Sequence, residues 1–337
     1  MTILAIISST RHSTLNIDDA GYHIIRQIAR HQPENQFILL LPDSIPTSLN
    51  NTPNIEWLMY KSSRWRFLER RNVRKKLKGI KADLCIALED AVYLPPAIPA
   101  IRWVYGELNQ AHKKWLSNPH IHWNLSLEPN TAWQSKFQIA QIPYKIYPPF
   151  VEWNETPYSE TDKQAFKEKY TRGDDYVLFN FMGIKEEKSL VTLLKAYTQF
   201  KKWNKTGIKL LIGCTGLQEN KILLLLQLYK FRSEVTILAV KDEKEWSDAI
   251  ASAFLLADFT KEHTLTASML RALDHGIPLI VKETNYFQSL MKDAVLYAKD
   301  DISAITSKLT LVYKDEQGNE ERRRCYNQMG MRIAKFY

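Results

Sequence analysis

The sequence of 337 residues lacks several features that define whole classes of protein. No stretch reaches the roughly 18 consecutive apolar residues of a membrane-spanning helix, which argues against a transmembrane segment. The apolar residues 1–10 carry no basic leader and no small-residue cleavage site, so we expect a buried strand there rather than a signal peptide. No G-x-G-x-x-G sequence follows an apolar run, which argues against a nicotinamide dehydrogenase. Nothing repeats at a period of about 20 to 50 residues, which argues against a solenoid.

Cysteine is scarce, and metal-binding patterns are missing. The 3 cysteines, Cys85, Cys214 and Cys325, are far apart, and the first two lie in apolar runs typical of strands. Buried free thiols in a reducing compartment are therefore expected, which favours a cytoplasmic location. No cysteine spacing suggests a metal site and no Asp-x-Asp sequence occurs, so we expect no metal.

The sequence does contain a long alternation of short apolar strands and helices. A chain of this length exceeds the roughly 250–300 residues that one core supports, so two domains are expected. The alternation predicts an α/β fold with mostly parallel sheets. Residues 146–173 are rich in Pro, acidic and Ser/Thr residues without an apolar period, and we expect a linker there. The predicted domains are residues 1–155 and 156–318, followed by a basic amphipathic helix over about 319–337.

Residues 260–281, TKEHTLTASMLRALDHGIPLIV, are the most informative stretch. They predict a loop, a helix with Thr266 as its N-cap, a stop at Gly276 with Pro278 after it, and a buried strand. A loop that enters a helix in a parallel sheet lies at the carboxyl edge of the strands, where ligands bind. The free N–H groups at that helix start suit an anion such as phosphate.

The layout of these segments resembles the retaining GT-B glycosyltransferases of family 4. The similar segments are GYHIIRQIARHQPENQFILLLP, ADLCIALED, IPAIRWVYGEL, YVLFNFMGIKEEKSLVTLLKAY, ALDHGIPLIV and the closing GMRIAKFY. The resemblance implies two Rossmann-like domains facing each other across a cleft, with the C-terminal helix crossing back to the N-terminal domain. It also implies transfer of a sugar from a nucleotide-sugar to a sugar or lipid-linked glycan acceptor, with retention. No cofactor is implied, because the nucleotide-sugar is a substrate.

The resemblance also suggests site residues in this chain. Fixed cations near the departing diphosphate would stabilise its developing charge. The suggested donor-binding residues are Gly183, Lys185, Lys188, Thr264, Leu265, Thr266 and Arg271. Glu262 and His263 would lie at the reacting centre, and the acceptor-side residues would be Thr14, Asn16, Tyr105 and Glu107. For Lys188 and Arg271, the alternative is an exposed helix residue without a ligand.

Several positions depart from the family pattern. Ile184 stands where the family carries an Arg, and Lys185 is the candidate substitute. Arg271 stands where the family carries a ribose-binding Glu, and it cannot accept a hydrogen bond. The glycine-rich loop after the first strand is missing. These losses keep open a second hypothesis, a non-catalytic glycosyltransferase-like binding or partner subunit.

Residues 62–81, SSRWRFLERRNVRKKLKGIK, contain nine Lys or Arg and one acid, with Trp65 and Phe67 among them. A basic helix bearing aromatic residues is typical of a helix on an anionic membrane surface. A solvated helix is the main alternative, and nucleic acid ranks last because no recognition motif accompanies the charge. We therefore expect a cytoplasmic protein that contacts the inner face of the plasma membrane through this segment.

Overall fold

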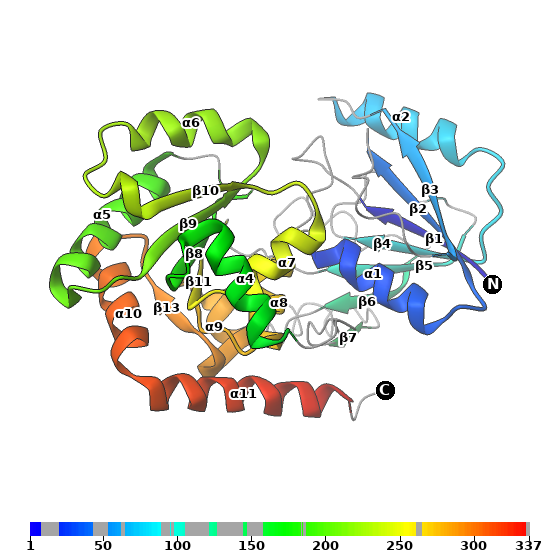
Figure 1. Ribbon diagram of the computed structural model, residues 1–337. Helices are drawn as coiled ribbons and strands as arrows, with labels where there is room; N and C mark the ends of the chain where they lie inside the picture. Colours follow the sequence, from blue (N-terminus) through cyan, green and yellow to red (C-terminus); the bar gives the residue numbers. More distant parts are fainter. Residues whose placement is uncertain are drawn as a thin grey trace. The chain divides into compact units, whose positions relative to one another are not determined.

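The computed structural model describes residues 1–7, 20–42, 53–61, 65–88, 95, 98–104, 121–126, 144–146, 158–182, 184, 187–260 and 265–334. The chain divides into two compact units, Met1–Val151 and Glu152–Tyr337. Each unit holds one parallel sheet with helices packed on it (Figure 1).

The sheet of the first unit has the strand order β3-β2-β1-β4-β5-β6-β7, and all of its neighbouring strands are parallel. Its strands are β1 (Thr2–Ile7), β2 (Gln36–Pro42), β3 (Ile55–Tyr60), β4 (Leu84–Leu88), β5 (Ala100–Val104), β6 (Ile121–Ser126) and β7 (Tyr144–Ile146). The order reverses at β1, which lies between β2 and β4. Such a reversal defines a doubly wound sheet.

Two helices accompany this sheet in the described residues, α1 (Ala20–His31) and α2 (Arg66–Leu77). Val73 and Leu77 of α2 are buried in one cluster with alternate residues of β1, β2 and β4. Alternate residues of a strand point to the same face of the sheet, so α2 covers one face. The basic segment therefore is a helix, held to the sheet by its apolar stripe.

The sheet of the second unit has the order β10-β9-β8-β11-β12-β13 and is also fully parallel. Its strands are β8 (Tyr176–Asn180), β9 (Lys209–Cys214), β10 (Val235–Ala239), β11 (Leu255–Asp258), β12 (Leu279–Lys282) and β13 (Leu296–Ala298). Here the order reverses at β8, between β9 and β11. The prediction of two Rossmann-like α/β units is confirmed.

The helices of the second unit cover both faces of its sheet. They are α4 (Glu160–Thr171), α5 (Glu187–Asn204), α6 (Gly216–Leu226), α7 (Glu243–Ala251), α8 (Ala267–Asp274), α9 (Asn285–Met291), α10 (Ile302–Lys314) and α11 (Glu316–Ala334), with short 3₁₀ turns η3 (Arg232–Glu234) and η4 (Lys292–Ala294). Val177 and Phe179 of β8 belong to the core cluster with α5, α6 and α10. Tyr176 points to the other face, where its hydroxyl donates to Ala249 O of α7 at 2.6 Å.

Helix α4 corrects the expectation of a linker over residues 146–173. Ser159 caps it reciprocally: Asp162 N donates to Ser159 Oγ at 3.1 Å, and Ser159 N donates to Asp162 Oδ2 at 3.2 Å. Only Phe166 and Thr171 of the helix are buried. A helix with so narrow a buried face has no apolar period, which is why the sequence pattern missed it.

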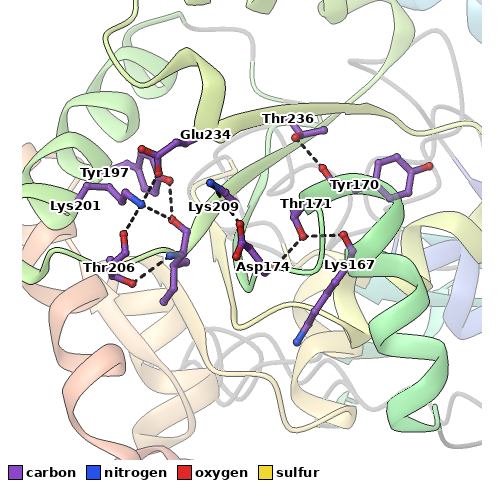
Figure 2. A network of polar contacts seen from close by, with 11 residues as sticks. Lys167, Tyr170, Thr171, Asp174, Tyr197, Lys201, Thr206, Lys209, Glu234 and Thr236 are labelled. Atoms are coloured by element: carbon purple, nitrogen blue, oxygen red, sulfur yellow. Dashed lines mark hydrogen bonds and ion pairs between the residues drawn. The ribbon is translucent and has the colours of Figure 1, made fainter.

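The amino edge of the second sheet is held by a polar network (Figure 2). Lys201 of α5 is buried, forms an ion pair with Glu234, and donates to the carbonyls of Thr206 and Ile208. Tyr197, one turn earlier, donates to Ile208 O at 2.8 Å. The bonds anchor the chain where β9 and β10 begin, so this edge is a structural one.

Helix α11 packs within the second unit. It contacts η4 and α10, and Arg323 lies over Gly276, where an added Cβ would come 2.3 Å from Arg323 Nε. Gly276 has a φ of +67°, a value that favours glycine, so its role in ending α8 is confirmed. The crossing of the last helix to the N-terminal domain stays a prediction.

Candidate functional site

The strand order of the second unit reverses between β8 and β11, and two polar residues end these strands. Asn180 ends β8 and Asp258 ends β11, and the two are register partners in the parallel pair. Both side chains are completely buried. In an open α/β sheet, ligands bind beyond the carboxyl ends of the strands at such a switch point. The site described here is therefore built around Asn180 and Asp258.

The Asp258 carboxylate accepts hydrogen bonds from three residues. Asn180 Nδ2 donates to Oδ2 at 2.8 Å, and the Thr266 hydroxyl donates to the same oxygen at 2.8 Å. The backbone N–H of Thr260 donates to Oδ1 at 3.0 Å. Asn180 Oδ1 in turn accepts from Met182 N at 3.1 Å. One carboxylate thus connects the ends of two strands with the start of α8.

Burial raises the pKa of Asp258 above its ordinary value, and the hydrogen bonds from Thr260, Asn180 and Thr266 offset part of that rise. A buried charge is costly unless hydrogen bonds or a counter-charge stabilise it. Here Asn180, Thr260 and Thr266 are neutral donors, and among the residues that the structure describes no Lys or Arg forms an ion pair with Asp258.

The chain after β8 is held from a second side by α6. Gln218 Nε2 lies 3.1 Å from Phe181 O and 2.8 Å from Ile184 O, and Phe181 N donates to Gly213 O at 2.8 Å. Gln218 itself belongs to the capping box of α6, in which Thr215 N donates to Gln218 Oε1. Ile184, which stands where the family carries an Arg, is buried in the core cluster. It supplies apolar packing and no charge.

Helix α8 begins as the sequence predicts. Thr266 is its N-cap and accepts from Met269 N at 3.1 Å. Leu265 is buried at 1% exposure, so its side chain packs inward. Ser268, also buried, accepts from Trp246 Nε1 of α7 at 2.8 Å. The first turn of α8 therefore belongs to a helix end that is fixed on two sides, by Asp258 and by α7.

The sequence left two hypotheses for Arg271, a donor-binding residue and an exposed helix residue, and the structure contradicts the second. Arg271 is 1% exposed, and its Nη2 lies 2.9 Å from Glu243 Oε1, the first residue of α7. The expectation of a solvated surface arginine is thus wrong, because the side chain points into the interface between α7 and α8. The donor-binding role of Arg271 stays a prediction.

Lys188 lies in the first turn of α5 and is exposed, next to Glu187, which pairs with Lys221 at 2.9 Å. The next residue, Ser189, donates to Asp300 Oδ2 at 3.1 Å. A cation in a first helical turn faces the positive end of the helix dipole, which favours a nearby anion. The structure places Lys188 after β8, as expected for a residue near the switch point.

Nine of the suggested site residues lie outside the described residues. They are Thr14, Asn16, Tyr105, Glu107, Gly183, Lys185, Glu262, His263 and Thr264. Of the suggested set, the described members are Lys188, Leu265, Thr266 and Arg271. Sequence reasoning missed Asn180, Gln218, Glu243 and Asp258, although polar residues that end otherwise apolar strands mark the first and last of these.

Two further observations concern metal binding and membrane-spanning helices. No group of three or more His, Cys, Asp or Glu that could hold a metal occurs in the part of the chain that the structure describes. Within that same part, no helix combines the length and hydropathy needed to cross a bilayer. The expectation that the reaction needs no metal stays a prediction.

Comparison with known proteins identifies the fold. No family model matches the chain, and no curated protein matches it in sequence. The chain is similar to HepE of Anabaena, solved with UDP and glucose, at 13% identity, over 99% of this chain and 95% of that chain, with a TM-score of 0.72. It is similar to sucrose-phosphate synthase of Thermosynechococcus elongatus at 12% identity, over 100% and 99% of the two chains, with a TM-score of 0.71. It is also similar to WaaG, a glycosyltransferase of lipopolysaccharide biosynthesis, at 11% identity, over 97% and 94%, with a TM-score of 0.67.

These similarities extend over nearly the full length of each chain. The protein therefore has the GT-B fold, which confirms the expected fold class. Membership of family 4 stays a prediction, because likeness at 11–13% identity establishes the fold alone.

Proposed function

We propose that the protein is a glycosyltransferase that moves a sugar from a nucleotide-sugar to a sugar or lipid-linked glycan acceptor. The observation that supports this most is the whole-chain likeness to HepE, which was solved with UDP-glucose, and to WaaG, a glycosyltransferase. Fold likeness alone is a weak argument for chemistry. The buried polar network at the β8–β11 switch point adds an independent one, because it lies where α/β sheets bind ligands.

In this proposal the second unit binds the donor. The N–H groups at the start of α8, fixed through Thr266, face the diphosphate, and Lys188 of α5 supplies a cation to it. A fixed positive charge lowers the barrier because the departing nucleoside diphosphate gains negative charge in the transition state. Lys185, Glu262 and His263 are proposed as its neighbours. We propose retention at the anomeric carbon and no requirement for a metal.

A nucleotide panel tests the donor site. Thermal unfolding is measured with UDP, GDP, dTDP, ADP and CMP, on the wild type, on Lys188→Ala and on Lys195→Ala. Lys195 is a matched control, since it is an exposed lysine further along α5. A ligand at a hundredfold excess over its dissociation constant stabilises the native state by about 2.7 kcal/mol. We expect one nucleotide to raise the melting temperature of the wild type and Lys195→Ala, and to act more weakly on Lys188→Ala.

The second candidate function is a non-catalytic binding or partner subunit of the same fold. The burial of Arg271 against Glu243 favours it, because the position that would bind ribose in the family here serves the α7–α8 interface. If none of the five nucleotides shifts the melting temperature of a folded sample, this second function replaces the first. Release of free nucleoside diphosphate from a nucleotide-sugar in the presence of an acceptor would exclude it, and the same release in EDTA would support the proposal that no metal is required.

We further propose that α2 lies on an anionic membrane surface. Glu69, Val73 and Leu77 form its buried stripe, with the Tyr60 hydroxyl donating to Glu69 Oε1 at 3.1 Å. This stripe leaves the cations on the outer face, where Arg70, Arg71, Arg74, Lys75 and Lys76 are exposed. Trp65 and Phe67, each 66% exposed, precede them. Each basic residue near anionic headgroups contributes about 1 kcal/mol.

Vesicle sedimentation tests the membrane proposal. Reversing the charge at Arg70, Arg71, Arg74 and Lys75 should abolish sedimentation with vesicles of phosphatidylcholine and phosphatidylserine. A control reverses four exposed lysines of the second unit, Lys195, Lys202, Lys230 and Lys299, and so carries the same net charge. Equal loss in both variants would mean that net charge alone drives binding, and equal retention would remove α2 as the contact.

A further inference from the structure

The Asp258 carboxylate occupies a position that stability alone does not favour. It is completely buried, the three residues that donate to it are neutral, and burial raises its pKa. Replacing buried charges by well-packed apolar residues is often neutral or stabilising. Its neighbours in β11, such as Leu256 and Ala257, are apolar. A carboxylate here therefore needs a reason beyond packing.

The Asp258 carboxylate connects three groups of the chain, and these connections explain its presence. Asp258 fixes the backbone of Thr260 directly, fixes the backbone of Met182 through Asn180, and orients the hydroxyl of Thr266. Met182 and Thr260 follow the two strands of the switch point, and Thr266 caps α8. These three segments are the ones from which the proposed donor site is built. Groups that bind a ligand must be held close to their productive positions, and neighbouring hydrogen bonds commonly do this.

We propose that Asp258, together with Asn180, is the positioning pair that preorganises the donor site of this protein. The inference rests on the proposed function for the ligand, a nucleoside diphosphate. It assigns no contact between Asp258 and that ligand, because the carboxylate is fully buried beneath the strand ends. Its effect is to reduce the conformational freedom that binding would otherwise have to remove.

The hydrogen-bond polarity of the pair allows a reciprocal test. In Asp258→Asn, the new side-chain amide faces the amide of Asn180 and has two possible orientations. In one of them its NH₂ group points at the NH₂ group of Asn180, so that two donors oppose each other. In Asn180→Asp, two carboxylates face each other. The double variant Asn180→Asp/Asp258→Asn restores a donor opposite an acceptor. Residue 180 still accepts from Met182 N, and residue 258 still accepts from Thr260 N. Of the hydrogen bonds described above, the one from the Thr266 hydroxyl is lost in the double variant, because residue 258 then presents a donor to it.

The experiment measures UDP affinity by calorimetry and the amide exchange of Met182 and Thr260 by NMR. We expect each single variant to weaken UDP binding about tenfold or more, which corresponds to about 1.4 kcal/mol, and to speed exchange at both amides. The double variant should return both quantities to within about threefold of the wild type. Tyr197→Phe is the control: it removes the bond to Ile208 O at the amino edge, lowers stability, and should leave UDP affinity unchanged.

Each outcome decides the inference. Single variants that bind UDP as the wild type does, or a double variant that stays as weak as the singles, would overturn it. If a single variant fails to fold, the double variant decides, because a folded and UDP-binding double variant supports the pairing and an unfolded one contradicts it. If the wild type binds another nucleotide of the panel and not UDP, that nucleotide takes the place of UDP in every comparison. If the wild type binds none of the five, the proposed function fails, and faster exchange in the single variants with recovery in the double variant still supports the positioning role.

Discussion

Arg271 of α8 and Glu243 of α7 form an ion pair, with Nη2 2.9 Å from Oε1, in which Arg271 is buried at 1% exposure and Glu243 is partly buried at 13%. Together with the Trp246–Ser268 hydrogen bond, it joins the two helices that follow β10 and β11. The start of α8 is thus fixed by Asp258 at the strand ends and by α7 at its side. The position at which the resemblance to family 4 predicts a ribose acceptor carries this helix-to-helix contact.

We expect Arg271→Met to destabilise the second unit by about 3–5 kcal/mol, because it removes the buried guanidinium that pairs with the partly buried Glu243 carboxylate. Arg271→Met/Glu243→Leu should recover most of this loss, since it removes both charges. Urea unfolding measures the free energies. The control is the Lys244–Asp248 pair, which is 3.0 Å long but has Lys244 81% exposed. Lys244→Met should lower the free energy of unfolding by less than about 1 kcal/mol. Equal losses for the two single variants would contradict a special role for burial.

The cap of α4 gives a second prediction. Ser159→Ala removes the hydroxyl that accepts from Asp162 N, and we expect it to lower the free energy of unfolding by about 1 kcal/mol. Ser159→Asp keeps an acceptor and should cost less. Proteolysis of the native protein between residues 160 and 171 provides the readout for local fraying, because an uncapped first turn opens more often. No change in either measurement would mean that α4 is held by its contacts with α7 and β9 and not by its cap.

Two glycines of the second unit should respond oppositely to alanine. A Cβ at Gly213 would lie 2.3 Å from Trp246 Cζ3, whereas one at Gly207 would meet nothing within 4 Å. Gly213→Ala therefore overpacks a buried contact and should cost about 1–3 kcal/mol. Gly207→Ala should be neutral or stabilise by up to about 1 kcal/mol, because it restricts the unfolded chain. Thermal unfolding of the two variants side by side checks the pair, and a tolerated Gly213→Ala would show that Trp246 shifts at little cost.

The buried thiols predict a loss of stability in alkali. Burial raises the pKa of Cys85 and of Cys214 to about 12, above the value near 9 of a free thiol. The native state therefore keeps these protons while the unfolded chain releases them. Stability is fully present below pH 9 and falls as the pH rises from about 9 toward 12, by up to about 1.4 kcal/mol per pH unit and thiol.

Unfolding free energies between pH 7 and 10.5 test this for the wild type and for Cys214→Ala. Cys214→Ala should be less stable than the wild type at pH 7 because it leaves a small cavity. The gap between the two proteins should narrow above pH 9, since only the wild type pays for keeping the Cys214 proton. Parallel curves over the whole range would contradict the expected burial of this thiol.

The alternation of strands and helices, the parallel sheets and the ends of α8 could be predicted from the sequence. These features depend on local patterns: apolar runs of strand length, Thr266 as an N-cap, and Gly276 at a positive φ. Each can be read from neighbouring residues, because the physical cause acts within one turn or one strand. The sequence also predicts Thr266 beside the strand ends that carry the candidate site, and Lys188 at the start of the helix that follows β8.

The contacts between polar residues that are far apart in the sequence could not be predicted and are seen only in the folded structure. Asn180 and Asp258 are 78 positions apart, and Arg271 and Glu243 are 28 apart. Both pairs form because parallel strands bring their carboxyl ends to one edge and the following helices pack beside each other. Arg271, which could have been a surface residue from its sequence context, is buried and paired with Glu243 for this reason. Helix α4 was not predicted from the sequence because it has no apolar stripe. A capping box and a narrow buried face stabilise it instead.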